Sequence, residues 1–248
     1  MDVILLSGGF GTRLEPISSF IPKALLPVGG RPLIDRIVDH VATFKQVERI
    51  IVDTNSKFED QFRHYVKTKT ASGFGKKLEL LIEPTRSHGE KLGQIRGIEY
   101  AVRNARITSD FMIISTDNYF DFSLEGIIAH FERSKNPTLG LFETKDMELL
   151  TRSGVVSLKG SKIVEFEEKP QKPKSSLLSM GFYIFPKGSV KLIDEYMVDN
   201  SNHDSMGYFI KWLIEKHETD GVVCKGIWID IGTMEAYKRV FEMTSNKE

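Results

Sequence analysis

Short, continuous apolar runs alternate with segments of helical periodicity through the first half of the chain. In residues 33–44, for example, Leu33, Ile37 and Val41 fall on one face of a helix. Apolar runs of this length are typical of strands in a parallel sheet that helices cover on both faces. The pattern predicts strands at residues 3–6, 49–52, 78–82 and 111–114, and helices at residues 33–44, 57–67 and from about 95 to 102.

The pattern changes after about residue 137. Turns rich in glycine, proline and lysine now separate the candidate strands, and helical periodicity returns only toward the end. We therefore expect a single domain over residues 1–248, with two halves at about 1–136 and about 137–248 that share one sheet. The second half is predicted to hold strands at residues 139–144, 154–158, 162–167 and 178–185, and helices at residues 190–197, 208–216 and from about 233.

A glycine-rich turn follows the first predicted strand. Residues 7–13 read Ser-Gly-Gly-Phe-Gly-Thr-Arg, and these glycines expose backbone N–H groups without a Cβ that would keep an anion away. Arg13 and, ten residues further on, Lys23 bring two cations to the same end of the strand, which suits a polyphosphate. The dinucleotide motif Gly-x-Gly-x-x-Gly would need glycine where Leu14 stands, and the P-loop motif is absent, which argues against a dehydrogenase.

The composition excludes several classes of function. Because 34 Lys plus Arg residues balance 34 Asp plus Glu residues, the chain has no net charge that would attract nucleic acid or an anionic membrane. The single cysteine, Cys224, excludes an internal disulfide and fits a reducing compartment. The sequence has no run of about 18 apolar residues and no basic-then-apolar leader, so we expect a cytoplasmic protein without membrane or nucleic-acid partners.

The block from residue 5 to residue 34 resembles the signature of the sugar-phosphate nucleotidylyltransferases, also called NDP-sugar pyrophosphorylases. That signature runs apolar-x-Gly-Gly-x-Gly-Thr-Arg-Leu-x-Pro, followed by Pro-Lys and a Leu-x-Pro-Val-x-x-x-Pro-Leu-Ile tail. The resemblance extends from Val3 to about Tyr237 and points to glucose-1-phosphate thymidylyltransferase-like enzymes. The matching residues are Gly8, Gly9, Gly11, Thr12, Arg13, Leu14, Pro16, Pro22, Lys23, Leu26, Pro27, Val28, Pro32, Leu33 and Ile34.

The resemblance implies both a fold and an activity. The fold is an α/β, Rossmann-like three-layer sandwich with a mainly parallel, mixed central sheet, the glycosyltransferase-A-like fold of nucleotidyltransferases. The activity is transfer of a nucleotidyl group from a nucleoside triphosphate to a sugar 1-phosphate, with release of pyrophosphate. The first half would bind the nucleotide and the second half the sugar. Relatives often carry a C-terminal left-handed β-helix, which we do not expect here because little of the chain follows Tyr237.

Later motifs resemble further steps of the family pattern. By this resemblance Asp117 and Asp230 are ligands of Mg²⁺, which prefers hard oxygen donors, and Arg13 and Lys23 are catalytic. We expect each aspartate to end or interrupt an apolar strand of the central sheet. The implied nucleotide-binding residues are Leu6, Gly8, Gly9, Gly11, Thr12, Arg13, Glu83 and Gly89, and the implied sugar-phosphate-binding residues are Asn118, Gly154, Glu168, Lys169 and Gly181.

Residues 83–93 depart from the family pattern, which commonly reads Gln/Glu-Pro-x-x-Gly-Thr/Leu-Ala-x-Ala. The segment is longer and more charged here, and this leaves open whether Gly89 or Gly93 contacts the base. A carboxylate at Glu83 accepts hydrogen bonds either from the two donors of guanine or from the single imide N–H of uracil or thymine. Resemblance over the rest of the chain favours dTTP or UTP with glucose 1-phosphate, and GTP with mannose 1-phosphate is the alternative.

A sugar 1-phosphate needs no general base to attack the α-phosphorus, because its phosphate is a dianion near neutral pH. The enzyme has to supply position and positive charge. We assign Arg13 and the glycine amides to the β,γ-phosphates, Lys23 to the α-phosphate and Lys169 to the sugar phosphate. A second class of function is a non-catalytic regulatory subunit that binds a nucleotide sugar, and the presence of these residues argues against it. The sugar, the pathway and a homo-oligomeric state stay open.

Overall fold

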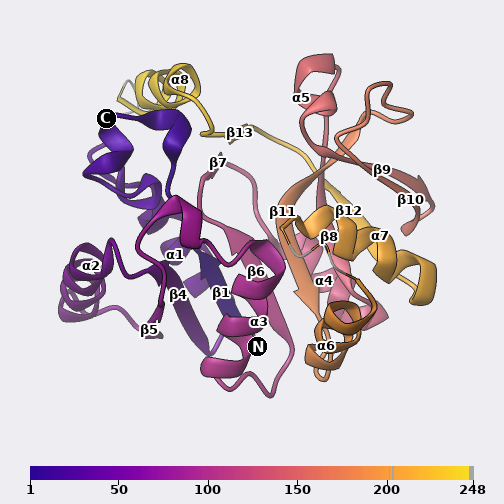
Figure 1. The fold of residues 1–248 in the computed structure, drawn as a ribbon, viewed down its shortest axis with the longest axis horizontal. Helices are drawn as coiled ribbons and strands as arrows, with labels where there is room; N and C mark the ends of the chain where they lie inside the picture. The colour runs from indigo at the N-terminus through magenta and orange to yellow at the C-terminus, as the bar shows by residue number, and fades with distance from the viewer. Residues whose placement is uncertain (201, 203, 246–248) are drawn as a thin grey trace. The chain divides into compact units, whose positions relative to one another are not determined.

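The computed structural model describes residues 1–200, 202 and 204–245 (Figure 1). The chain divides into two compact units. The first unit comprises Met1–Lys91, Ile114–Asp121 and Gly226–Glu248, and the second comprises Leu92–Ile113 and Phe122–Lys225. Each unit is therefore assembled from stretches that lie far apart in the sequence, and the single domain that we expect stays a prediction.

The first unit contributes β5, β4 and β1 to a sheet, in the order β5-β4-β1 and with parallel pairing, and β6 follows β1 in that sheet. Its main elements are β1 (Asp2–Leu6), α1 (Leu33–Ala42), β4 (Arg49–Asn55), α2 (Glu59–Ala71), β5 (Lys77–Glu83) and the end of β6 (Phe111–Ser115). β1 pairs in parallel with β4, and β4 with β5, so Leu6 lies opposite Asp53 and Asn55 lies opposite Glu83. The elements predicted for this part of the chain are confirmed, with ends that differ by a few residues.

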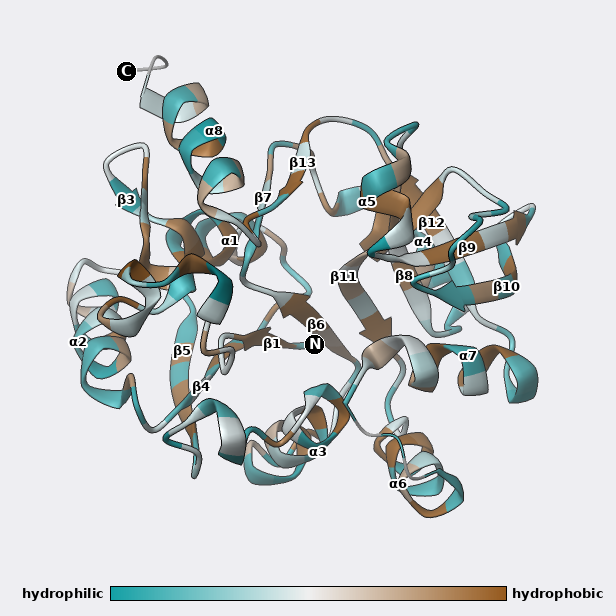
Figure 2. Ribbon diagram, turned by 45° about the horizontal axis from the view of Figure 1, so that its top comes forward, coloured by the Kyte–Doolittle hydropathy of each residue, from teal (hydrophilic) through white to brown (hydrophobic). Residues whose placement is uncertain are grey.

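The apolar runs of the sequence form the core of the first unit. Val3, Ile4 and Leu5 are fully buried in β1, and α1 buries Ile37 and Val41 on one face. Figure 2 shows β1 and β6 as hydrophobic along their lengths, as expected for strands covered on both faces. A further buried cluster joins all three stretches of the unit and consists of Leu14, Leu26, Val28, Leu33, Tyr119, Ile229, Ile231 and Val240.

A separate two-stranded antiparallel sheet consists of β7 (Asn118–Phe120) and β13 (Trp228–Asp230). We expected Asp230 to end or interrupt an apolar strand of the central sheet. Asp230 does end a strand, β13, but the placement in the central sheet is wrong, because β13 pairs with β7. Strands of three residues are too short for a hydrophobic pattern to assign them to a sheet. After β13, the hydroxyl of Thr233 accepts a hydrogen bond from the Ala236 N–H at 3.2 Å and caps α8 (Met234–Ser245).

The connection from β1 to α1 consists of short turns. It contains the 3₁₀ turns η1 (Thr12–Leu14), η2 (Ile17–Ser19) and η3 (Lys23–Leu25), followed by β2 (Pro27–Val28) and β3 (Arg31–Pro32). β2 and β3 pair with each other as a small antiparallel hairpin. The two cations proposed for the polyphosphate therefore stand on η1 and η3.

The sheet of the second unit is mixed, with the strand order β11-β8-β12-β10-β9. β12 is parallel to β8, whereas β11 is antiparallel to β8 and β10 is antiparallel to β9 and β12. The sequence pattern missed α4, α5 and β12. The elements are α3 (Gln94–Asn104), α4 (Glu125–Ser134), β8 (Thr138–Glu143), α5 (Met147–Thr151), β9 (Gly154–Lys159), β10 (Lys162–Glu168), β11 (Leu177–Phe185), α6 (Val190–Asp199), α7 (Met206–Lys216) and β12 (Asp220–Cys224).

Helices and a sheet that mixes parallel and antiparallel strands confirm the predicted α/β class. Among the described residues, no helix combines the length and the apolar character needed to cross a membrane.

Candidate functional site

The glycine loop, residues 7–13, begins where β1 ends. Its Ser7 N–H donates to the Asp53 carbonyl oxygen at 2.7 Å, which continues the pairing with β4 for one residue beyond the strand. A Cβ on Gly8 would lie 3.0 Å from Glu83 Oε2, so a side chain there would push the carboxylate away. Gly11 has φ +63° and starts η1, a conformation that favours glycine. A Cβ on Gly9 would meet nothing within 4 Å.

Ser18 ties η2 to the glycine loop, a role that the sequence analysis did not identify. Its hydroxyl donates to the Gly11 carbonyl oxygen at 2.7 Å, and the residue is buried. A Cβ on Gly11 would lie 3.0 Å from Ser18 Cβ. The signal available in the sequence was a small polar residue between the two expected cations, which by itself did not distinguish Ser18 from the neighbouring Ser19.

The two expected catalytic cations lie in the first unit, on either side of Ser18. Lys23 Nζ lies 3.1 Å from Asp117 Oδ2, and the lysine side chain is only 13% exposed. Arg13 is exposed and forms no ion pair with any described residue. Its Nη1 and Nη2 atoms would each lie 3.4 Å from a Cβ on Gly232, and Asp230 Oδ2 would lie 3.1 Å from the same Cβ. Gly232 thus leaves room for the guanidinium and the carboxylate to approach each other.

The expected metal ligands stand on neighbouring backbone segments. Asp230 lies opposite Asn118 in the pairing of β13 with β7, and the Ile231 N–H donates to the Asp117 carbonyl oxygen at 2.8 Å. Within the described part of the chain, no three His, Cys, Asp or Glu side chains are placed to hold a metal ion. A pair of carboxylates beside a glycine loop still fits Mg²⁺, which takes one or two protein carboxylates and completes its shell with phosphate oxygens and water.

A second pair of carboxyl groups, Asp53 and Glu83, lies near the carboxyl ends of β4 and β5. Both are buried. Burial raises the pKa of Asp53 well above its usual value of 3.8, and the nearby charge of Glu83 raises it further. Burial also raises the pKa of Glu83, while the hydrogen bond with Asp53 opposes that rise. Glu83 was predicted from the sequence, whereas Asp53, which lies one residue beyond the strand predicted at residues 49–52, was not.

The raised pKa of Asp53 predicts a stability that falls as the pH rises. Above pH 3.8 the unfolded chain loses the Asp53 proton while the folded chain keeps it, so the free energy of unfolding decreases by up to about 1.4 kcal/mol per pH unit. Asp53→Asn removes this titration. Urea unfolding from about pH 4 upward is therefore expected to show the variant gaining stability relative to the wild type as the pH rises. Parallel curves would contradict the raised pKa.

In the second unit, Glu168 is held by a tight set of contacts. It ends β10 opposite Gly154 of β9, and the Ser205 hydroxyl donates to its Oε1 at 3.0 Å. A Cβ on Gly207 would lie 1.9 Å from Glu168 Oε2, so only glycine leaves the carboxylate in place. Gly154 is equally constrained, since its Cβ would lie 2.3 Å from the ring of Phe166. The support that Ser205 and Gly207 give to Glu168 was not predicted from the sequence.

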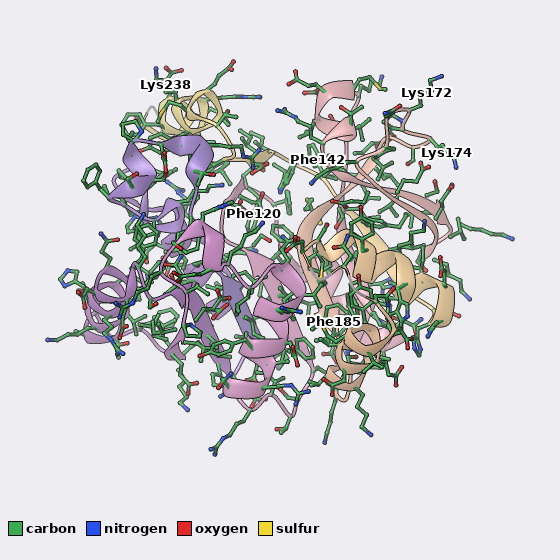
Figure 3. All side chains as sticks on the ribbon, viewed as in Figure 1. Phe120, Phe142, Lys172, Lys174, Phe185 and Lys238 are labelled. Atoms are coloured by element: carbon green, nitrogen blue, oxygen red, sulfur yellow. The ribbon has the colours of Figure 1, made fainter. Side chains whose placement is uncertain are left out.

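Lys169 follows Glu168 and adopts a positive φ of 49°. Its Nζ lies 3.6 Å from Glu168 Oε1, and 63% of the side chain is exposed. Figure 3 labels two further lysines on the loop between β10 and β11, Lys172 and Lys174. Lys174 is already engaged by Glu165 and by Glu167, the latter at 3.4 Å. Lys169 is therefore a better candidate for an anion than Lys174.

The remaining expected glycines differ in their surroundings. Gly181 has φ +78° and lies where the pairing of β11 with β8 shifts register. Gly89 stands in the exposed turn η4 (His88–Glu90), and a Cβ there would meet nothing within 4 Å. Gly93 has φ +84° and precedes α3. Of the implied sugar-phosphate residues, Asn118 belongs to the first unit, and Gly154, Glu168, Lys169 and Gly181 belong to the second.

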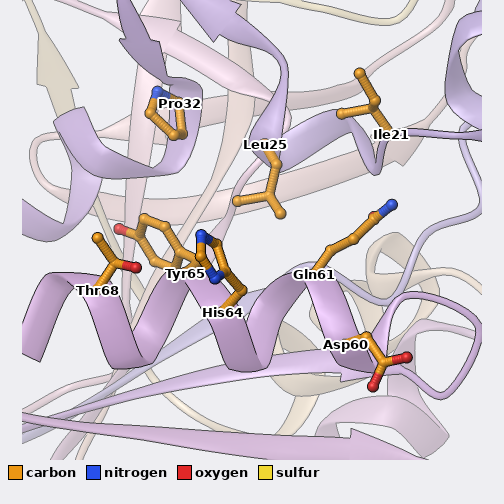
Figure 4. A pocket seen from close by; sticks show the side chains of 8 residues that line it. All are labelled: Ile21, Leu25, Pro32, Asp60, Gln61, His64, Tyr65 and Thr68. Atoms are coloured by element: carbon orange, nitrogen blue, oxygen red, sulfur yellow. The ribbon is translucent and has the colours of Figure 1, made fainter.

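A cavity of about 560 Å³ opens in the first unit between α2 and the turns before α1 (Figure 4). It contains none of the expected site residues, although Ile21 and Leu25 stand on either side of Lys23 in the sequence. The side chains that line it are Ile21, Leu25, Pro32, Asp60, Gln61, His64, Tyr65 and Thr68.

Comparison with known proteins yields relatives over nearly the whole chain. The model of a family described as nucleotidyl transferase matches residues 2–247. The bifunctional protein GlmU of Methanococcus aeolicus is 29% identical over 235 residues, which are 94% of this chain and 51% of the relative, so the chain spans about half the length of GlmU. UTP–glucose-1-phosphate uridylyltransferase AglF of Haloferax volcanii is 26% identical over 239 residues, covering 95% of this chain and 93% of AglF. A solved UDP-glucose pyrophosphorylase complexed with UDP-glucose shares the fold, with a TM-score of 0.81, 18% identity and coverage of 100% of this chain and 99% of that one.

Proposed function

Because the chain belongs to the nucleotidyl transferase family, we propose that it transfers a nucleotidyl group from a nucleoside triphosphate to a sugar 1-phosphate. The products are an NDP-sugar and pyrophosphate. The observation that carries this proposal is the set of two cations and two carboxylates around the glycine loop of the first unit. Lys23 lies 3.1 Å from Asp117, and Arg13 and Asp230 both approach Gly232.

The reaction needs charge and position more than proton transfer. The phosphate of a sugar 1-phosphate is a dianion near neutral pH and attacks the α-phosphorus directly, so no general base is required. The barrier comes from bringing two anions together and from the charge that develops on departing pyrophosphate. Residues that hold both substrates and supply positive charge therefore account for catalysis.

The glycine loop is suited to the β- and γ-phosphates. Gly9 has open space where a side chain would stand, which allows an anion to approach the backbone amides of residues 8–12. Arg13 adds a planar guanidinium that is free of other ion pairs among the described residues and can bind two phosphate oxygens at once. In this proposal Leu6, Gly8, Gly11 and Thr12 complete the nucleotide contacts.

Lys23 is suited to the α-phosphate and the attacking oxygens, because it is largely buried and already faces a carboxylate of the expected metal pair. Mg²⁺ held by Asp117 and Asp230 would neutralise triphosphate charge and polarise the α-phosphoryl group when bound. The residues themselves keep the ammonium group of Lys23 oriented, since Asp117 Oδ2 fixes its Nζ.

In the second unit, Glu168 and Lys169 are proposed to bind the sugar 1-phosphate. Glu168 is fixed by Ser205 and offers its remaining acceptor sites to sugar hydroxyls. Lys169 would neutralise the phosphate, and Gly154 and Gly181 would allow close approach of the backbone. For Asn118, which belongs to the first unit, the contact to the sugar stays a prediction of the family resemblance.

Glu83 is the proposed contact to the base, with dTTP or UTP and glucose 1-phosphate as the first choice of substrates. Guanylyl transfer to mannose 1-phosphate is the alternative, because a carboxylate also suits guanine. A cytoplasmic location fits a chain whose one cysteine, Cys224, is buried with its pKa raised by that burial to about 11.

The test is pyrophosphate release across the four ribonucleoside triphosphates and dTTP, each with a panel of sugar 1-phosphates and Mg²⁺. Turnover with UTP or dTTP and glucose 1-phosphate is the expected result. A kcat/KM for GTP more than about tenfold above those for UTP and dTTP would reverse the order of substrates. Saturable binding of triphosphate without turnover on any sugar phosphate would support a regulatory subunit instead.

Lys169→Ala is expected to raise the KM for the sugar 1-phosphate by about tenfold and to change kcat little. The reason is that the sugar phosphate is anionic both before and during the reaction, so the lysine binds the ground state and the transition state alike. Steady-state kinetics with the sugar phosphate as the varied substrate measures this. The matched control is Lys172→Ala, an exposed lysine of the same loop (Figure 3). An effect on triphosphate KM alone would contradict the assignment.

A further inference from the structure

Asp53 is a buried acid that the proposed mechanism does not use. It is 1% exposed, and neither of its carboxyl oxygens accepts a hydrogen bond from any N–H or hydroxyl group of the described residues. Arg49, the only cation in β4, is engaged by Asp2 at 2.8 Å and by Glu79 at 3.2 Å. An isolated buried carboxylate is costly, so Asp53 needs another partner.

The register of the sheet supplies that partner. Asn55 lies opposite Glu83, and alternate residues of a strand share a face, so Asp53 and Glu83 lie on the same face of neighbouring strands. Diagonal positions on neighbouring strands bring long side chains within reach of each other, and the effect of each carboxyl group on the pKa of the other agrees with contact between them. Two carboxylates only accept hydrogen bonds, so this contact requires that one of the two groups carries a proton.

The surroundings indicate which of the two groups is the acid. Asp53 is the more deeply buried, at 1% exposure against 7% for Glu83. Glu83 stands at the last position of β5, and its Oε2 packs against Gly8 of the glycine loop. The Asn55 side-chain amide donates to the Gly8 carbonyl oxygen at 2.9 Å and fixes the loop to the same strand end. The proton therefore belongs on Asp53, and the charge belongs on Glu83.

We propose that Asp53 is a positioning residue that donates its carboxyl proton to Glu83 and so holds Glu83 as an oriented, ionised acceptor for the base. This inference rests on the proposed function, because it takes Glu83 as the contact to a nucleobase. It adds a reason for discrimination among bases. An ionised acceptor favours uracil, thymine and guanine, which present an imide-type N–H, over cytosine and adenine, which present a ring nitrogen lone pair in its place.

Two substitutions separate positioning from a purely structural role. Asp53→Asn keeps the shape and an N–H donor toward Glu83, whereas Asp53→Leu keeps about the same volume and removes the donor. We expect Asp53→Leu to lower the ratio of kcat/KM for UTP to that for CTP by about tenfold, since one hydrogen bond to a charged acceptor is lost. Asp53→Asn is expected to keep the wild-type ratio. If guanine is the preferred base, GTP against ATP gives the same comparison.

A second measurement needs no substrate and so separates this inference from the proposed function. Infrared spectra of the whole protein at neutral pH should show the carbonyl band of one protonated carboxyl group, and Asp53→Asn should abolish it. The band without turnover of any triphosphate would contradict the proposed function and support the shared proton. Absence of the band from the wild type would overturn the inference. So would an Asp53→Leu variant that unfolds at the same urea concentration as the wild type and keeps the wild-type ratio of kcat/KM for UTP to that for CTP.

Discussion

Asp117→Asn and Asp230→Asn are each expected to lower kcat by about a thousandfold. An asparagine keeps the size of the side chain and one oxygen, but it removes the negative charge that would hold Mg²⁺ against the triphosphate. Metal-assisted stabilisation of the transition state amounts to several kcal/mol, and each 1.4 kcal/mol is about tenfold in rate. Single-turnover measurements at saturating substrate isolate the chemical step from binding.

The double variant tests whether the two aspartates act as one unit. Because both carboxylates are proposed to hold the same ion, Asp117→Asn with Asp230→Asn is expected to be little slower than either single variant. Mg²⁺ should raise the thermal midpoint of the wild type and leave that of the double variant unchanged. Asp121→Asn is a matched control, since this exposed aspartate accepts a hydrogen bond from the Ile227 N–H at 2.7 Å and an asparagine can still accept it.

Two outcomes would contradict the shared metal site. One is multiplicative loss in the double variant, which would mean that the two carboxylates contribute independently. The other is a structure with Mg²⁺ and triphosphate in which the carboxylates lie more than about 8 Å apart, too far for one ion with Mg–O bonds of about 2.1 Å.

Arg13→Ala is the second large effect, with kcat expected to fall by about a hundredfold or more. The guanidinium is proposed to meet the charge that appears on pyrophosphate as it leaves, so the loss should affect kcat more than the KM for triphosphate. Arg13→Lys should recover only part of the rate, because an ammonium group cannot bind two phosphate oxygens in one plane. Rapid-quench measurement of the first turnover in both directions of the reaction gives these values.

A matched arginine controls for loss of charge. Arg63 of α2 is exposed and pairs with Glu59 at 2.6 Å on the same helix, so Arg63→Ala removes the same charge from the same unit at a surface position. It is expected to leave kcat unchanged. A fall in triphosphate affinity alone in Arg13→Ala would mean that the arginine binds the ground state and not the departing group.

Local patterns were enough to predict the strands and helices whose faces are apolar. The runs that became β1, β4 and β6 are buried on both faces, and the stripe of α1 faces the core, so each carries its own periodic signal. β7 and β13 carry no such signal, because each has three residues and exists through pairing between parts of the chain that are far apart. The place of Asp230 depended on that pairing and was therefore not predictable from its neighbours in sequence.

The residues of the candidate site also fall into those that a local sequence pattern identifies and those that depend on contacts between distant parts of the chain. Gly8 and Gly11 were identifiable because their spacing and their lack of a side chain are visible in the sequence, and the structure gives each a contact or a φ that requires glycine. Asp53, Ser205 and Gly207 were not identified. Each acts on another residue, Glu83 or Glu168, through a contact that only the register of a sheet or the start of a helix creates.

The ribosome synthesises the chain from its N-terminus to its C-terminus. The first unit therefore lacks its last stretch of sequence until nearly all of the chain has been translated. The glycine loop and Lys23 emerge early, but the buried cluster around Tyr119 lacks Ile229 and Ile231 until the last stretch, which begins at Gly226, has been made. The second unit, in contrast, is complete once Lys225 has been added. The nascent protein therefore carries an unfilled apolar surface while most of residues 122–225 are translated, and exposed apolar surface of this kind makes partly folded chains prone to aggregate.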